Sequence, residues 1–196
     1  MRRLQQSWEM SQDEPSPLVV ALYVRDVAGL SPSAEPVLPP LDPPVPAEQV
    51  DGDVGVASAQ WDQWWRRAWP GTLQSMLELS EPGLPAFADA PELQTLLLRF
   101  LPAARAWSDA RAEELSDLTL RQYKSGDDLV LCHLVSEVER DLRRPAAPFK
   151  LRIVELPLAG KTGWVVSTTQ VIVTHALLAD PQALRSWMRP VVAAVA

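Results

Sequence analysis

The residues that most often carry out chemistry are scarce in this chain. Its 196 residues include one cysteine, Cys132, and two histidines, His133 and His175. A lone cysteine excludes an intramolecular disulfide and a zinc site built from cysteines.

A glycine-rich phosphate-binding loop is also missing. Gly160-Lys161-Thr162 matches the end of a P-loop, but Glu155 stands five positions before Gly160, where that motif requires glycine. The residues after Thr162 have the composition of a strand, whereas a P-loop leads into a helix. A turn between two strands explains these residues better than a P-loop does. For the chain as a whole we expect no cofactor and no metal.

Basic charge is in deficit as well. The net charge is -7 and the isoelectric point is near 4.9. A nucleic-acid-binding surface is normally basic, so this balance disfavours such a function. Lysine occurs three times, isoleucine twice and asparagine never, a bias that indicates a GC-rich bacterial or phage genome.

No apolar run is long enough to span a membrane. Arg2 and Arg3 are followed by polar residues where a signal peptide would have its apolar core, so we expect a cytoplasmic protein. Hydrophobic residues make up 47% of the chain and charged residues 22%, which is ordinary for a soluble globular protein. The length suits one domain, or one domain with an arm.

Proline, in contrast, is abundant, with nineteen residues. Seven of them lie in the segment 31–46, where their fixed φ angles and missing donors exclude a helix or the interior of a sheet. The segment predicts an extended arm of roughly 50 Å at about 3.1 Å per residue. Two Pro-x-x-Pro motifs would allow it to dock on an aromatic groove, but no basic residue flanks them, which favours a spacer or a segment that wraps the surface.

The hydrophobic pattern predicts an α+β fold, predominantly helical, with a small antiparallel sheet made of an N-terminal strand and a C-terminal hairpin. The apolar run 17–24 is expected to be a buried strand, and the strands of the hairpin region are expected at 149–158, 164–168 and 171–173. Helices are expected at 57–69, 72–79, from 91 to about 120 with a stop or kink at Pro102, from 127 or 128 to before Pro145, and 181–189. We divide the chain into an N-terminal segment with one strand (1–30), the proline-rich arm and loop (31–56) and a main domain (57–196).

Several groups of residues could form a site, and each has a simpler explanation. His133 and Glu137 share a helix face and could reach one ion, with His175 as a third ligand, but a solvated face explains them better. Cys132 points away from His133 around the helix and is expected to be a buried thiol. Ser167, His175 and Asp180 could compose a catalytic trio, and Glu113, Glu114 and Asp117 an acidic cluster, yet no motif supports either.

The densest feature is an aromatic cluster on the helix expected at 57–69. Trp61, Trp64, Trp65 and Trp69 fall on one arc of that helix, beside Arg66 and Arg67. The cluster is either a core face that packs under the sheet or a surface that binds a partner. The adjacent proline arm favours the second interpretation, in which these six residues anchor the contact.

The sequence therefore predicts a non-catalytic protein that binds another protein, in an accessory, assembly or neutralising role like that of an immunity protein. The first alternative is a small hydrolase or transferase whose site is assembled only in the fold, with His175 or His133 as acid or base. The second is a structural component of a larger bacterial or phage assembly. We expect neither nucleic acid nor membrane as a partner, and the oligomeric state stays open.

Overall fold

The fold is described from a computed structural model that covers residues 8–13, 15–33, 35–69 and 73–196. The chain forms two compact units. The first, which we call the helical unit, consists of residues 15–112 and 157–159. The second, the sheet unit, contains the N-terminal strand together with residues 113–156 and 160–196. These units do not coincide with the ranges 1–30, 31–56 and 57–196.

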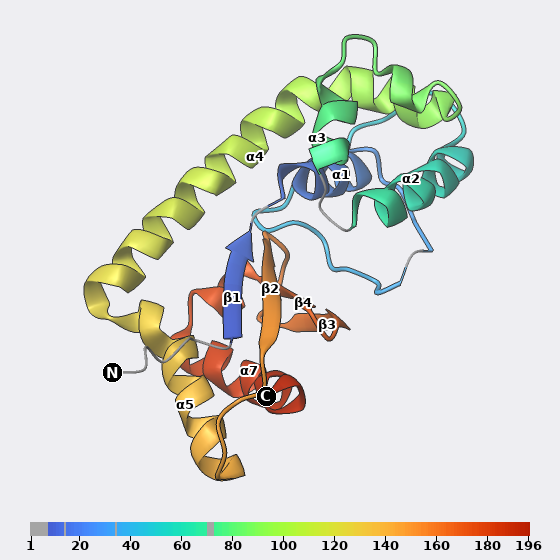
Figure 1. The fold of residues 1–196 in the computed structure, drawn as a ribbon. Coiled ribbons are helices and arrows are strands. Elements are labelled where there is room, and N and C mark those ends of the chain that lie inside the picture. The colour runs from blue at the N-terminus through green and yellow to red at the C-terminus, as the bar shows by residue number, and fades with distance from the viewer. Residues whose placement is uncertain (1–7, 14, 34, 70–72) are drawn as a thin grey trace. The chain divides into compact units, whose positions relative to one another are not determined.

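The helical unit is built from α1 (Ser16–Val27), α2 (Val54–Ala68), α3 (Leu73–Ser80) and the first part of the long helix α4 (Pro91–Ser125) (Figure 1). A short 3-10 turn at Pro85–Phe87 precedes α4. Helices α2 and α3 confirm the expected positions to within a few residues. Pro70 and Gly71, which follow the helix expected at 57–69 and were expected to end it, lie outside the described residues.

The expected strand at 17–24 is wrong, because this segment is α1. A continuous apolar run is equally typical of a buried strand and of a helix that is buried all round. Residues 18–22 and Val24 are at most 1% exposed, so α1 is of the second kind. Pro17 lies in the first turn, where its missing N–H has no helical partner in any case.

The sheet unit holds four strands: β1 (Trp8–Asp13), β2 (Phe149–Leu156), β3 (Gly163–Ser167) and β4 (Gln170–Thr174). Their order is β1-β2-β4-β3. Strand β1 is parallel to β2 and β2 is parallel to β4, and only β3 and β4 form an antiparallel hairpin. The sheet is therefore mixed rather than antiparallel, and the N-terminal strand lies at 8–13 rather than at 17–24.

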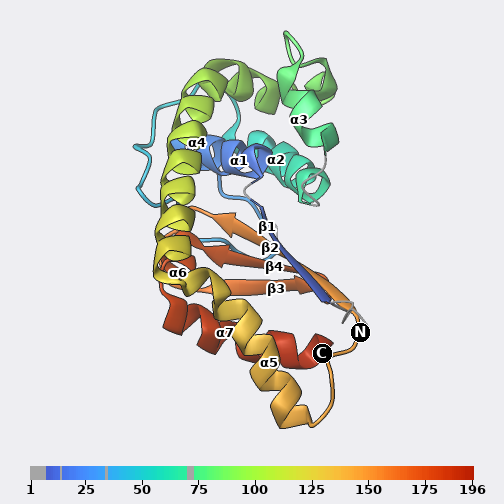
Figure 2. The same cartoon turned by 60° about the vertical axis from the view of Figure 1, so that its left-hand side comes forward.

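Helices α5 (Val130–Leu142), α6 (His175–Leu178) and α7 (Pro181–Val195) complete the sheet unit, and a 3-10 turn at Asp127–Leu129 precedes α5. Figure 2 shows α5 and α7 next to each other on one side of the sheet. They bury Leu134 and Val138 of α5 and Met188 of α7 against Leu151 and Ile153 of β2. This is the core of the sheet unit.

Prolines lie inside two helices and directly after one strand. Helix α4 continues through Pro102, so of the expected stop or kink the stop does not occur, and α7 continues through Pro190 to Val195 rather than ending at 189. Strand β2 lies inside the sheet, and Pro157 directly follows its last residue, Leu156, which is a usual place for proline near the end of a strand. Within the described ranges, no helix has both the length and the apolar composition needed to cross a bilayer.

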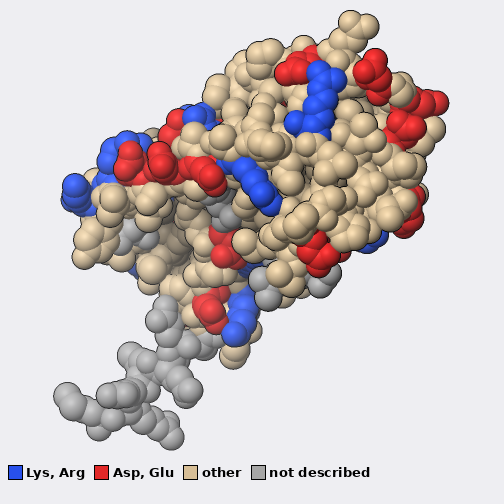
Figure 3. Space-filling view, turned by 90° about the horizontal axis from the view of Figure 1, so that it is seen from above, with Lys and Arg blue, Asp and Glu red and all other residues tan. Residues whose placement is uncertain are grey.

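Charge is unevenly divided between the units. The helical unit has twelve acidic and six basic residues, whereas the sheet unit has thirteen and twelve. The acidity of the chain thus belongs mainly to the helical unit. On the face drawn in Figure 3, acidic side chains lie in several small groups, some of them directly beside basic side chains.

Candidate binding surfaces

The aromatic cluster lies mostly inside the helical unit. Asp53 begins α2 by accepting hydrogen bonds from the N–H groups of Gly55 and Val56, and the helix then turns its indoles inward. Trp61 and Trp65 are each 2% exposed, and Trp64 is fully buried. Almost none of the surface of these three side chains is therefore open to a partner protein.

Contacts among the rings confirm the core interpretation for these three residues. Trp61 and Trp65 are stacked with their ring centroids 4.9 Å apart, and Trp64 meets Phe87 edge-on at 5.3 Å. The Nε1 of Trp61 donates a hydrogen bond to the carbonyl oxygen of Ala21 in α1, at 2.7 Å. The expectation that Trp61, Trp64 and Trp65 form an open partner-binding face is corrected accordingly.

The remaining members of the cluster are more accessible. Trp69 is half-buried and lies tilted against Trp65, and both Arg66 and Arg67 are exposed. Exposed arginines next to a single half-buried indole are ordinary for a helix that covers a core.

The proline-rich arm is fastened to the helical unit rather than free. Arg25 of α1 donates to the carbonyl oxygens of Leu38 (3.2 Å) and Pro39 (2.8 Å). Its Nε pairs with Asp26 at 2.6 Å, and the second carboxylate oxygen of Asp26 accepts the N–H of Leu41. The arm therefore wraps the surface, which is one of the two forms expected from its sequence.

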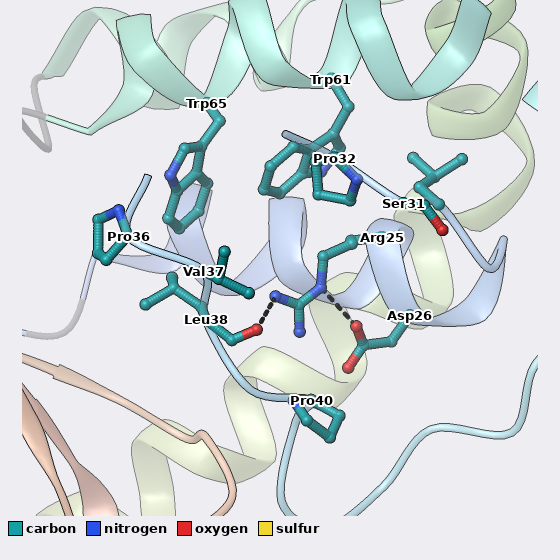
Figure 4. A pocket seen from close by; sticks show the side chains of 11 residues that line it. Arg25, Asp26, Ser31, Pro32, Pro36, Val37, Leu38, Pro40, Trp61 and Trp65 are labelled. Carbon is teal, nitrogen blue, oxygen red and sulfur yellow. Dashed lines mark hydrogen bonds and ion pairs between the residues drawn. The ribbon is translucent and has the colours of Figure 1, made fainter. Parts of the chain in front are cut away.

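Underneath the arm lies a pocket of about 310 Å³ (Figure 4). Trp61 and Trp65 form one wall, and prolines and aliphatic residues of the arm face them. Arg25 lies at its base with its guanidinium bonded to the arm and to Asp26. Because its only charges already neutralise each other, the pocket offers a ligand chiefly apolar and aromatic contact.

A larger groove lies in the sheet unit between β3 and α7. Its volume is about 640 Å³, and none of its lining residues is charged. Strand β3 contributes alternate residues to one wall, and the other wall comes from an apolar face of α7. The lining residues are Gly163, Val165, Ser167, Thr168, Ser186, Trp187, Pro190, Val191, Ala194 and Val195.

This groove was not expected from the sequence, although α7 contains a signal for it. Leu184, Met188 and Val192 form the buried face of α7. Trp187 and Val191 lie next to this face, at one edge of the same broad apolar arc, and are only half-buried. Because the arc extends past the residues that α7 buries completely, its half-buried edge indicates a further contact surface.

Glu137, which with His133 could have reached one metal ion from α5, forms ion pairs with α7 instead. Glu137 accepts hydrogen bonds from Arg185 at 2.5 Å and Arg189 at 3.3 Å, both on α7. The hydrogen bond from Arg185 is the main cause that holds the pKa of Glu137 below its ordinary value of 4.5. His133 is exposed, and no group of three potential metal ligands occurs in the part of the chain that the structure describes.

The suggested catalytic trio is not assembled. Ser167 bonds with Thr169, and Asp180 caps α7 at the N–H of Ala183 while it pairs with Lys161 at 2.8 Å. The bond from Lys161 is the leading cause that lowers the pKa of Asp180 from 3.8.

His175 has a different partner from the one expected. Its Nδ1 lies 3.2 Å from Oε1 of Glu155, a carboxylate that is only 2% exposed. The pair joins the carboxyl ends of the parallel strands β2 and β4. Glu155 thus orients the imidazole, which is one element of an acid–base site.

Three further expectations can be compared with the structure. Cys132 is exposed, so the expected buried thiol is wrong; the apolar stripe of α5 passes through Leu134, Val135 and Val138 instead. Glu113, Glu114 and Asp117 lie on an exposed face of α4. The residues 160–162 lead into β3 rather than a helix, as expected for a turn next to a strand.

No protein-family model, curated protein or solved structure matches this chain.

Proposed function

We propose that the protein works without catalysis by binding a partner protein in the groove between β3 and α7. The observation that carries this proposal is the combination of size and neutrality in that groove, which has a volume of about 640 Å³ and no charged lining residue. Binding sites for apolar segments are concave, and an apolar surface left open on a folded unit marks an interaction site.

The groove replaces the six residues of the aromatic cluster as the proposed contact. Trp61, Trp64 and Trp65 contribute to the stability of the helical unit, and the arm covers part of the same unit. Trp187 takes the role of anchor in the proposal, because tryptophan is one of the residues most enriched at interface hot spots.

A photo-crosslinking experiment tests this function in cells of the source organism. A benzophenone amino acid is placed at Val165, which is 61% exposed and lines the groove, or at Met76, which is 51% exposed on α3. We expect position 165 to give one reproducible crosslinked protein that position 76 does not give.

Matched variants on α7 establish that the groove is responsible. Ala194 lines the groove, and its neighbour Ala193 is also exposed but does not line it. Ala194→Trp should abolish the crosslink from position 165, whereas Ala193→Trp should leave it intact. Identical crosslinks from positions 165 and 76, or insensitivity to Ala194→Trp, would refute the proposed function.

The contact between His175 and buried Glu155 favours a second candidate, a small hydrolase that uses His175 as acid or base. A carboxylate that orients an imidazole is a recurring part of such sites. Turnover of p-nitrophenyl esters and phosphates is the measurement. Under this candidate His175→Gln removes the activity and His133→Gln, a change at an exposed position, does not; equal rates in both variants would exclude it.

A further inference from the structure

The edge strand β3 has two residues whose backbone groups are left open on its outer side. The order β1-β2-β4-β3 makes β3 an edge of the sheet. In an antiparallel pair, residues bonded to the neighbouring strand alternate with residues whose N–H and C=O point away from it. The N–H of Thr174 donates to the carbonyl oxygen of Thr162, which identifies Thr162 and Trp164 as the inward-bonded residues and Gly163 and Val165 as the outward ones.

Both of these outward residues, Gly163 and Val165, also line the groove. Gly163 and Val165 both face α7, two residues apart on one side of the strand. A chain that paired with the outer edge of β3 would therefore place its own side chains, at the same spacing, between β3 and α7. The backbone ladder and the apolar groove thus form one continuous site.

The floor of this site is closely fitted. A Cβ atom at Gly163 would lie 2.7 Å from Cζ2 of Trp187, so the glycine allows the indole to lie directly against the strand. Trp187 in turn lines the groove beside Val191. The groove is therefore a packed feature of the β3–α7 contact.

The two edge strands of the sheet differ in how well they are protected against pairing with another chain. Natural edge strands are commonly guarded against pairing by charged side chains or proline. Strand β1 has such guards, since Glu9 pairs with Lys150 and Asp13 pairs with Arg152. Strand β3 contains neither a charged residue nor proline, and its bulge between Val165 and Ser167 lies beyond the two outward residues.

We propose that the groove binds its partner by strand addition, as an extended, uncharged segment with alternating apolar residues that pairs with Gly163 and Val165. This inference rests on the proposed protein-binding function and names the kind of segment that the site takes. The electrostatics of the groove favour an uncharged segment. A charged side chain would lose its water there, and no charged residue of the groove would pair with it.

A second copy of this chain is a poorer occupant than a different protein. Paired with itself, β3 would present Gly163, Val165 and Ser167 to the groove of the other copy. These side chains are small and leave most of a volume of about 640 Å³ empty. The groove requires larger apolar side chains, such as leucine, isoleucine or phenylalanine.

A synthetic peptide tests strand addition on the full chain. The probe is Gly-Thr-Ile-Thr-Val-Thr-Leu-Thr-Gly with an amidated C-terminus and an electrically neutral BODIPY dye on its N-terminus, measured by fluorescence anisotropy. Two further peptides have N-methyl groups on Ile, Val and Leu or on the inner Thr residues. Antiparallel pairing uses the N–H groups of the apolar set and parallel pairing those of the threonine set, so one methylated peptide should bind at least about tenfold more weakly and the other should resemble the parent.

Substitutions at Val165 test the same backbone pairing between the peptide and β3 from the side of the protein. Val165→Pro removes an N–H that the pair with β4 does not use, whereas Val165→Thr keeps both that N–H and a β-branched shape. We expect a loss of at least about tenfold in affinity for proline and less than about threefold for threonine. Thermal unfolding midpoints close to that of the wild-type protein confirm that both variants fold.

Three results would overturn the inference. They are absence of binding by the parent peptide, equal binding of all three peptides, and equal affinity of the proline and threonine variants. A fourth such result, measured by sedimentation, is a dimer that Val165→Pro abolishes. This result would assign the edge of β3 to a second copy of the chain. If Ala194→Trp removes the cellular crosslink from position 165 but Val165→Pro and Val165→Thr bind the parent peptide with equal affinity, the protein-binding function stands and strand addition falls.

Discussion

At the scale of single residues, two buried tryptophans of α2 differ in one hydrogen bond. The Nε1 of Trp61 donates to Ala21, whereas the Nε1 of Trp64 has no acceptor among the described residues. Trp61→Phe therefore removes a bond, and Trp64→Phe removes a buried donor that was already unpaired. We expect Trp61→Phe to lower the free energy of unfolding by about 1–3 kcal/mol more than Trp64→Phe does, as measured by urea denaturation.

The larger truncation at the same position tests whether this cluster is core. Trp64 is fully buried against Phe87, so Trp64→Ala should cost about 3–5 kcal/mol. The half-buried Trp69 is the control, and its replacement by alanine should cost clearly less. Equally small losses of unfolding free energy at both positions would show that the cluster is an exposed surface and not part of the core.

Gly163 is the residue on which the groove depends. A Cβ there would lie 2.7 Å from both the carbonyl oxygen of Ile172 and the ring of Trp187. Because the first of these atoms belongs to the backbone of β4, it cannot move aside cheaply. Gly163→Ala should destabilise the protein by about 1–3 kcal/mol, while Thr168→Ala at the exposed turn changes the unfolding free energy by less than about 0.5 kcal/mol.

At the scale of elements, the contact between α5 and α7 depends on pH. The pKa of Glu137 is lowered from 4.5, chiefly by the hydrogen bond from Arg185, so the folded state favours the charged carboxylate. Its contribution to stability is complete above the unfolded-state pKa and is lost as the pH falls through the lower, folded-state pKa. The difference in unfolding free energy between the wild-type protein and Glu137→Gln should therefore be largest near neutral pH and should shrink progressively below pH 4.5.

The arm makes a second prediction at this scale. The N–H of Leu41 donates to Asp26, and the next amide, that of Asp42, donates to the carbonyl oxygen of Pro157. In Asp26→Ala the first bond is lost and the second remains. Hydrogen exchange measured by NMR should accelerate at Leu41 and stay slow at Asp42. Acceleration at both amides would show that the arm detaches as a whole.

The sequence pattern identified the amphipathic helices but not α1 or β1. Helices α2, α5 and α7 each have a distinct apolar face, and all three were predicted. The segment of α1 is buried on every side, so its run of apolar residues has no period that separates helix from strand. Strand β1 reads Trp-Glu-Met-Ser-Gln-Asp, and its strand state depends on pairing with β2, about 140 residues later in the chain.

The candidate site was hidden from the sequence for a similar reason. A cluster of tryptophans is visible in the sequence, but whether it faces a core or a partner depends on α1 and on Phe87, which cover it. The groove combines β3 with a helix that begins fourteen residues after that strand ends. Its edge strand became recognisable only when the order β1-β2-β4-β3 placed β3 outside β4.

At the scale of the whole molecule, the chain passes between its two units more than once. Helix α4 begins in the helical unit and ends in the sheet unit, and residues 157–159 return to the helical unit between β2 and β3. The ranges 1–30, 31–56 and 57–196 were drawn from changes in local composition. Such changes mark linkers between continuous domains and carry no signal for units assembled from separate segments.

The division of charge between the units predicts how binding responds to salt. The net charge of -7 belongs mainly to the helical unit, and the proposed groove in the sheet unit has no charged lining residue. The Debye length is about 10 Å at 0.1 M salt, so added salt screens interactions between charges and leaves contacts between uncharged groups largely unchanged. The affinity for the uncharged peptide should therefore change by less than about twofold between 0.05 and 0.5 M NaCl. A decline of tenfold or more across that range would place the binding energy on charged residues outside the groove, and the acidic surface of the helical unit would become the surface to mutate.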